Sequence, residues 1–232
     1  MILKRLREEV LEANLELVRR GLVLYTFGNA SGISREEGLV VIKPSGVPYE
    51  KMKPQHLVIV KLDGKIVEGN LRPSSDLPTH LILYRAFSEL GGIAHTHSRY
   101  ATAWAQAGRE IPCFGTTHAD YFHGAIPVTK ALTQKQIRSD YEGNTGNAIV
   151  RRFVKLDPLH FPAVLVAGHA PFCWGETPSR AAHTAVVLEE VAALALATLT
   201  ANPKTRAISK HLHHKHFLRK HGASAYYGQK KK

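Results

Sequence analysis

The feature that most constrains the fold is a hairpin signature, "HLVIVKLDGKIVEG", at residues 56–69. Two apolar runs flank the dipeptide Asp63-Gly64, which is suited to a type I′ turn. Two strands joined by so short a loop pair antiparallel, because a parallel pair needs a much longer crossover. The sequence therefore favours a sheet with antiparallel elements over a doubly wound parallel sheet.

Other strand and helix signals alternate along the chain. "GLVVIKPSG" predicts a strand that runs into a turn, "GIAHTHS" a strand that leads into a helix, and "AVLVAGHAPFCWG" two extended pieces with a break at 168–171. Apolar spacing predicts helices over Leu3–Arg20, over "SSDLPTHLILYRAFSELGG" up to its double glycine, and over Ser179–Thr200. The expected fold class is α/β: a single mixed, largely antiparallel sheet covered by helices.

The length and composition predict one domain, residues 1–232, with a basic C-terminal helix and tail from about residue 204. The chain has 232 residues and is 44% hydrophobic, enough to bury a sizeable core. Its N-terminus is charged and amphipathic rather than signal-like, and the longest apolar stretch, Val191–Leu199, is too short to span a membrane. Cys113 and Cys173 make no disulfide framework. We therefore expect a cytoplasmic protein with no membrane partner.

The net charge of +12 is concentrated near the C-terminus. From Val191 onward there are seven Lys, two Arg and no carboxylate, so nine of the twelve excess positive charges lie there. The aromatic residues of this segment are few and bunched, and attraction for anionic metabolites or a solvated basic face explains the charge as well as nucleic acid does. Nucleic acid is not the partner we expect. The histidines of this segment could bind metal adventitiously: His211, His213, His214 and His216.

His95 and His97 stand two residues apart after an apolar run. Residues i and i+2 of a strand point to one face, so both imidazoles could share an ion; the alternative is two satisfied histidines at a strand end. His169 follows another apolar strand, and three imidazoles with an open position are typical of a catalytic Zn²⁺ site. Mn²⁺ or Co²⁺ would also suit imidazole. Asp76, at the start of its predicted helix, is a further metal candidate or equally an N-cap.

Three short segments have the composition of a phosphate site: "FGNASG" (27–32), "KPSG" (43–46) and "RPSSD" (72–76). Exposed backbone N–H groups, Ser hydroxyls and one Lys are what a phosphoryl group needs. Each segment alone is a common turn. Ser74 and Ser75 carry more weight because they precede a helix, where N–H groups are free and the helix dipole favours an anion.

These segments, taken in order, resemble the class II aldolase/adducin family. The matching stretches run from the first helix to Gln229: "GNASG", "KPSG", "PSSDLPTH", "GGIAHTHS", "GTTHADYF", "GHAPFCWG" and "KHGASAYYGQ". The matches are loose over 141–162 and 201–210. Within the family, the chain is most similar to members that epimerise a pentulose phosphate. This resemblance implies a metal-dependent conversion of L-ribulose 5-phosphate to D-xylulose 5-phosphate.

The resemblance also implies a role for each matching residue. The three imidazoles would hold a zinc ion, with Asp76 beside them. Asp120 and Tyr227 would be acid/base residues that act across an interface in a cyclic homotetramer; without the resemblance they would be a turn carboxylate and a surface aromatic. The apolar helix expected over 181–199 also points to an oligomer. Substrate and phosphate contacts would come from seven residues: Gly28, Asn29, Lys43, Ser45, Gly46, Ser74 and Ser75.

The implied chemistry explains why such groups are needed. In a 2-ketose phosphate the hydrogen on C4 is not adjacent to the carbonyl and is barely acidic, so deprotonation is a poor route to inversion. Cleavage of C3–C4 instead leaves an enediolate, which a metal can stabilise, and an aldehyde that can turn about its anchored phosphate. Re-addition to the other face then needs two proton-transfer groups on opposite sides of the aldehyde.

Two other functions remain open. An aldolase of the same family would release the aldehyde, and it has Glu after the paired serines where this chain has the shorter Asp76. A non-enzymatic, adducin-like module would lack the metal, whereas all three histidines are present here. Asp76 and the ending "YYGQ" favour the epimerase.

Overall fold

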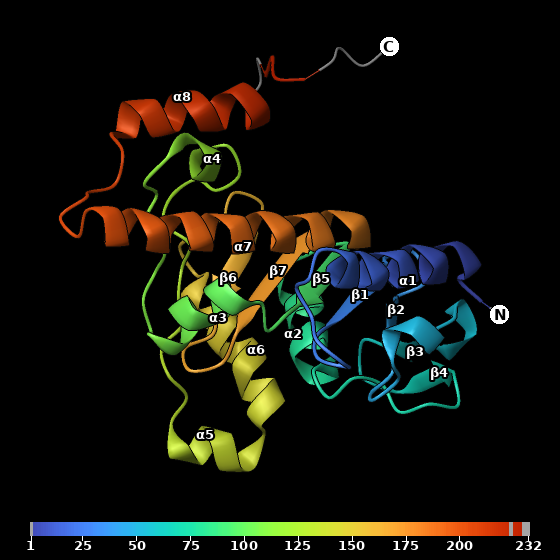
Figure 1. The fold of residues 1–232 in the computed structure, drawn as a ribbon. Coiled ribbons are helices and arrows are strands. Elements are labelled where there is room, and N and C mark those ends of the chain that lie inside the picture. The colour runs from blue at the N-terminus through green and yellow to red at the C-terminus, as the bar shows by residue number, and fades with distance from the viewer. Residues whose placement is uncertain (1, 223–224, 229–232) are drawn as a thin grey trace.

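A computed structural model describes residues 2–222 and 225–228. Within that part, seven strands form one sheet in the order β4-β3-β2-β1-β5-β7-β6, and each neighbouring pair is antiparallel (Figure 1). This arrangement confirms the predicted antiparallel sheet. The strands are β1 Asn29–Ser34, β2 Leu39–Ile42, β3 Val58–Lys61, β4 Ile66–Glu68, β5 Gly92–His95, β6 Ala163–Leu165 and β7 Pro171–Gly175.

Helices cover both faces of the sheet (Figure 1). On one face α1, α3 and α7 pack together, and on the other α2 packs against α6. The helices are α1 Lys4–Arg19, α2 Leu77–Ala86, α3 Arg99–Gln106, α4 Thr116–Ala119, α5 Gln134–Ser139, α6 Tyr141–Arg152, α7 Pro178–Ala201 and α8 Lys210–His221, with 3₁₀ turns at Tyr49–Lys51 and Pro54–His56.

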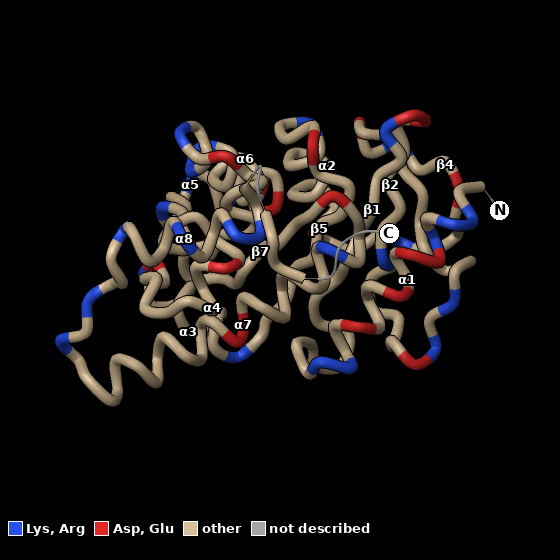
Figure 2. Tube along the Cα trace, turned by 90° about the horizontal axis from the view of Figure 1, so that it is seen from above, with Lys and Arg blue, Asp and Glu red and all other residues tan. Residues whose placement is uncertain are grey.

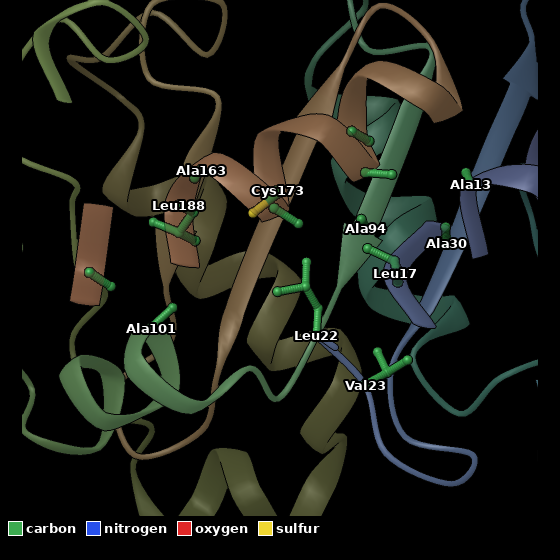
Figure 3. Packing of buried hydrophobic residues seen from close by; sticks show 14 of the residues in the cluster. Ala13, Leu17, Leu22, Val23, Ala30, Ala94, Ala101, Ala163, Cys173 and Leu188 are labelled. Atoms are coloured by element: carbon green, nitrogen blue, oxygen red, sulfur yellow. The ribbon is translucent and has the colours of Figure 1, made fainter. Parts of the chain in front are cut away.

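The sheet separates two apolar cores. Figure 3 shows part of the first core, where Leu17 of α1 lies near Ala94 of β5, and Leu188 of α7 lies near Ala163 of β6. The second core lies under α2 and α6 and contains the neighbouring strand residue Ile93. Because side chains alternate along a strand, His95 falls on the same side as Ile93, and its ring stacks on Phe172 of that second core.

α7 is longer than the apolar stretch singled out in the sequence. It has 24 residues, and by length and composition it is the one helix in the described part of the chain that could cross a membrane. It packs on β1, β5, β6 and β7 and buries side chains such as Leu188 against them. Leu194 and Leu196, near its end, stay 46% and 43% exposed. α7 is therefore a core helix with an apolar surface near its C-terminal end.

Three local predictions were wrong in detail. The β3–β4 hairpin forms, but only Gly64 (φ 91°) and not Asp63 has a positive φ, so the turn is not type I′. α2 ends at Ala86 rather than at the double glycine. Gly91 instead precedes β5 and Gly92 begins it, at a place where the chain passes very close to 176–178. Most of 27–32, which resembles a turn in sequence, is the central strand β1, because it pairs with both β2 and β5.

The basic C-terminal segment forms α8, which packs on α4 and its following loop (Figure 1), with Lys and Arg along it (Figure 2). The Ser209 hydroxyl caps the helix by accepting from the N–H of Leu212. Phe217 is buried against the loop, and His213 Nε2 lies 2.9 Å from the carbonyl oxygen of Phe122. Two of the segment's histidines, His213 and His216, are thus engaged in packing contacts with the α4 region.

Candidate functional site

Three imidazoles converge where β5 ends and β6 turns into β7. His95 is the last residue of β5, His97 follows it, and His169 lies in the β6–β7 connection. The Nε2 atoms of His95 and His97 are 3.2 Å apart, and one nitrogen of each ring lies within 4.8 Å of the others. The rings meet because β5 and β7 are neighbours in the sheet. Within the described residues, this is the group of three ligands compact enough for one ion.

Burial favours the neutral form of two imidazoles of the cluster, His169 and His97. Burial, helped by the neighbouring rings, lowers the pKa of His169 to about 4, and burial likewise lowers the pKa of His97. The Nδ1 of His95 lies 2.9 Å from the carbonyl oxygen of Pro171, so Nδ1 donates and Nε2 is the nitrogen that faces the cluster. Neutral imidazole is the form that binds metal, and this donor set fits a divalent cation.

Asp76 borders the cluster rather than capping its helix. It stands at the N-cap position of α2, but its side chain accepts no hydrogen bond from the helix. Its Oδ2 accepts from Asn29 Nδ2 at 2.6 Å and lies 4.0 Å from His95 Nε2. Burial opposes ionisation, but His95 and the Asn29 hydrogen bond outweigh it and lower the pKa of Asp76. An ionised carboxylate therefore faces the imidazoles.

A cavity of about 470 Å³ opens beside the cluster. It brings together every residue that the sequence proposed for the metal or the substrate, from the start of β1, the ends of β2 and β5, and the β4–α2 and β6–β7 connections. Asp120 and Tyr227 are not among its lining residues. The predicted residues that do line the cavity are Gly28, Asn29, Lys43, Ser45, Gly46, Ser74, Ser75, Asp76, His95, His97 and His169.

Lys43 is the cation of this cavity. Its side chain is almost fully buried, and Nζ donates to the carbonyl oxygen of Thr26 at 3.2 Å. Burial lowers the pKa of Lys43 to about 8, with the Asp76 carboxylate opposing the shift. Backbone hydrogen bonds from Ser45 to Arg72 and from Ser74 to Lys43, each 2.9 Å, join the two serine loops. Lysine, serine hydroxyls and loop N–H groups thus lie together on one wall.

Gly28 is required by the backbone at this site. Its φ is 70°, and a Cβ there would lie 2.7 Å from the carbonyl oxygen of His95. A side chain would therefore push β1 away from the strand that carries the first imidazole. The sequence pattern identified Gly28 as a substrate contact, and the structure adds this packing reason for a glycine.

The cavity also has lining residues that the sequence did not propose as contacts: Thr26, Phe27, Tyr141 and Glu142. The Tyr141 ring lies 5.9 Å from that of His169, and the Phe27 ring 6.4 Å from that of His97. Tyr141 begins α6, whose N-cap Asp140 accepts from Gly143 N. An Asp just before this helix is the sequence signal that could have placed its first residues.

Asp120 and Tyr227 lie together, but away from the cavity of their own chain. The Asp120 carboxylate accepts from Arg219 Nε at 2.9 Å and from His216 Nδ1 at 3.0 Å. Burial raises its pKa, but these bonds and Lys220 outweigh burial and lower it. The Tyr227 ring is 59% exposed and lies beneath Arg219 and Lys220, with 4.8 Å and 4.3 Å to its centroid. α8 thus presents both groups on one basic surface.

The fold and the imidazole cluster define a class of protein. The family model described as the class II aldolase and adducin N-terminal domain matches residues 8–196, and the chain belongs to this family. Class II aldolases are metal-dependent, and the three histidines could hold the ion. The chain is 54% identical, over 98% of its length and the whole length of the relative, to L-ribulose-5-phosphate 4-epimerase UlaF of Salmonella paratyphi B, and equally to that of Salmonella typhi.

Solved structures agree on the fold. An L-fuculose 1-phosphate aldolase superimposes with a TM-score of 0.77 at 24% identity, covering 91% of this chain and 94% of its own. YgbL from Klebsiella pneumoniae gives a TM-score of 0.74 at 26% identity, covering 93% of this chain and 99% of its own. At 24% identity, the likeness to the aldolase shows the fold alone.

Proposed function

We propose that this chain is a metal-dependent epimerase that interconverts L-ribulose 5-phosphate and D-xylulose 5-phosphate in the cytoplasm. The observation that carries the proposal is the 54% identity, over 98% of the chain, to epimerases of that name. The cavity supports it, because an imidazole cluster and an anion-binding wall face the same space. These are the two sites that a phosphorylated ketose needs if its C3–C4 bond is to be broken and remade.

The proposed metal is zinc, held by His95, His97 and His169 with Asp76 at its side. When bound, a divalent ion supplies a Lewis acid that stabilises negative charge on the sugar oxygens as C3–C4 breaks. Three neutral nitrogens with room for another ligand are typical of catalytic zinc, although Mn²⁺ and Co²⁺ also accept imidazole. Two of these groups are oriented by hydrogen bonds, since His95 donates to the carbonyl oxygen of Pro171 and Asp76 accepts from Asn29.

The proposed phosphate anchor is the wall formed by Lys43 and the two serine loops. Ser74 and Ser75 directly precede α2, where the dipole of the helix favours an anion. The ammonium group of Lys43 adds a buried positive charge beside them. If the phosphate stays anchored here, the aldehyde fragment can rotate about it and present its other face to the enediolate.

Ser75→Ala is expected to raise KM by about tenfold and to lower kcat much less. The hydroxyl would bind the phosphate equally in the ground and transition states, and the loss of one such hydrogen bond to a charged group is worth about 1.5–3 kcal/mol. Steady-state kinetics on L-ribulose 5-phosphate measure the change. The control variant is Ser88→Ala. Ser88 is exposed and does not line the cavity, so this variant should behave as wild type. A fall in kcat at constant KM would contradict the assignment.

The lowered pKa of Lys43 predicts an alkaline limit on substrate binding. The free enzyme loses the Lys43 proton as pH rises through about 8, so KM should rise above that pH while it stays flat below. The bound dianion favours the ammonium form, so kcat should be less affected than kcat/KM. Lys43→Met should raise KM at every pH and abolish this transition. A KM profile of Lys43→Met that still turns upward near pH 8 would exclude Lys43 as its source.

The proposed acid/base groups are Asp120 and Tyr227 of a neighbouring copy in a cyclic homotetramer. Asp120 ends α4 and Tyr227 lies in the segment after α8, and Arg219 and Lys220 of α8 contact both residues and keep them close to each other. Each would serve one face of the aldehyde, giving up or taking the proton on its oxygen. The exposed apolar end of α7 is surface that such an assembly could cover.

The test of the function is incubation of the metal-loaded protein with L-ribulose 5-phosphate. ³¹P NMR separates D-xylulose 5-phosphate, the expected product, from free glycolaldehyde phosphate. Accumulation of glycolaldehyde phosphate with dihydroxyacetone would make the chain an aldolase. No turnover with zinc, manganese or cobalt would refute the enzymatic proposal.

A further inference from the structure

A polar seam crosses the second core behind the imidazole cluster. Asp76, His80 and Tyr84 stand four residues apart at the start of α2 and along it, and so share one side of the helix. Asn29 and Ser31 stand two apart on one face of β1. Asn29 donates to Asp76 at 2.6 Å, and Ser31 Oγ lies 2.7 Å from His80 Nδ1 and 2.8 Å from the Tyr84 hydroxyl. These five residues are the polar seam.

The seam is poorly explained as a source of stability. Ser31, His80 and Tyr84 are 0% exposed, and the side chains around them are those of an apolar cluster. Burying polar groups costs free energy that their hydrogen bonds only roughly offset, so apolar side chains would stabilise this core at least as well. Hydrogen bonds differ from apolar contacts in being directional. A seam of them fixes how far α2 slides along β1 and how it is rotated.

His80 connects the seam to the wall of the metal centre. Its ring meets the edge of Phe172 (5.9 Å, 69°), and Phe172 stacks flat on His95 (4.1 Å, 18°). Burial lowers the pKa of His80 to about 3, with Asp76 opposing the shift, so the ring is neutral. Its Nε2 is buried and has no hydrogen-bond partner among the residues that the structure describes. His80 therefore adds no charge beside the cluster.

A backbone hydrogen bond links His80 to Asp76, so the position of one residue constrains the other. The N–H of His80 donates to the carbonyl oxygen of Asp76 at 3.1 Å, so the two residues span the first helical turn. The Ser31 hydrogen bond ties this turn to β1, and two residues earlier on β1 Asn29 holds the carboxylate itself. The two connections, Ser31–His80 and Asn29–Asp76, leave the turn little freedom to move against the strand.

We propose that His80 is a positioning residue for the metal centre: bonded to Ser31, it fixes the turn of α2 that presents the Asp76 carboxylate to the three imidazoles. The proposal rests on the metal site of the proposed function, but not on which sugar is turned over.

Two substitutions separate the Ser31 hydrogen bond from the bulk of the ring. His80→Asn places an amide atom near the position of Nδ1 and can keep the bond, whereas His80→Leu fills the space and removes it. Zinc affinity is measured by competition with a chromophoric chelator, and the ligand field by the visible spectrum of the Co²⁺-loaded protein. His80→Leu should bind zinc about 10–100-fold more weakly and shift the Co²⁺ spectrum, as expected when a group behind a ligand is lost. His80→Asn should stay within a few-fold of wild type.

His118→Leu is the matched control. His118 is also buried, with Nε2 2.7 Å from the carbonyl oxygen of Gly124 and Nδ1 without a partner in the described part of the chain, and it does not line the cavity. It should lose comparable thermal stability and keep its zinc affinity. If His80→Leu does not fold, Ser31→Ala deletes the same hydrogen bond by removing one oxygen, and it should weaken zinc binding in the same direction.

Zinc-saturated His80→Leu should keep the KM of wild type, since the phosphate wall is untouched, and lose kcat. Zinc affinity and a Co²⁺ spectrum equal to those of wild type in both His80→Leu and Ser31→Ala would overturn the proposal, as would an equal loss of zinc affinity in His118→Leu. A wild-type protein that binds zinc but does not epimerise L-ribulose 5-phosphate would overturn the proposed function alone.

Discussion

His97→Ala is expected to lose its metal and its activity while keeping its fold. His97 lies outside β5 and is the most exposed of the three histidines, so truncation removes little buried surface. Zinc affinity should fall more than 100-fold. Loss of a residue that only orients a metal ligand already lowers metal affinity by about 10–100-fold, and here the ligand itself is lost. Epimerase activity should fall with it, since the Lewis acid is lost.

Metal analysis of dialysed protein, activity and thermal melting together check this result. His56→Ala, in a 3₁₀ turn that does not line the cavity, is the control and should keep metal and rate. Full metal content and full activity in His97→Ala would refute the imidazole site. A large drop in melting temperature of the metal-free protein would instead make His97 a structural residue.

The sequence located the strand ends but not how they meet. An apolar run followed by histidine is a local pattern, and it correctly put His95 at the end of β5 and His169 in the segment that follows β6. Their rings converge because β7 pairs with both β5 and β6. These pairings join residues far apart in the chain, and no local sequence pattern predicts them. The same holds for β1: its small, polar residues look like a turn, and pairing on both sides makes them a strand.

The sequence indicated the wall formed by Lys43 and the two serine loops, but it did not indicate Tyr141 and Glu142, which also line the cavity. The loops at Lys43 and Ser74 follow strand and helix boundaries, so their turn residues and hydroxyls are visible in the sequence. Tyr141 and Glu142 fall in a segment where the family resemblance is loose, and they reach the cavity only because α6 packs on α2. Asp120 and Tyr227 were assigned by resemblance alone. In that acid/base role they would act on the site of a neighbouring subunit.

Mixing two inactive variants tests that role directly. Tyr227→Phe removes a proton donor with little change of shape, and it should lower the epimerase rate by about 10²–10⁴ with unchanged metal content. His97→Ala leaves Tyr227 intact but disables the metal site of its own chain, here called the metal half of the active site. If a site combines the metal half of one subunit with Tyr227 of its neighbour, hybrid oligomers contain sites that have both halves intact.

The expected recovery follows from the symmetry of a closed ring. When equal amounts of the two variants are co-expressed and assemble at random, a given site has an intact metal half with a chance of one half and an intact Tyr227 from its neighbour with the same chance. About one quarter of wild-type activity should therefore return. A mixture of His97→Ala with His169→Ala is the control: both defects lie in the metal half, so no combination of subunits rebuilds it. If Tyr227 instead served its own chain, the first mixture would stay as inactive as the second, because each site would carry one defect whichever neighbour it had.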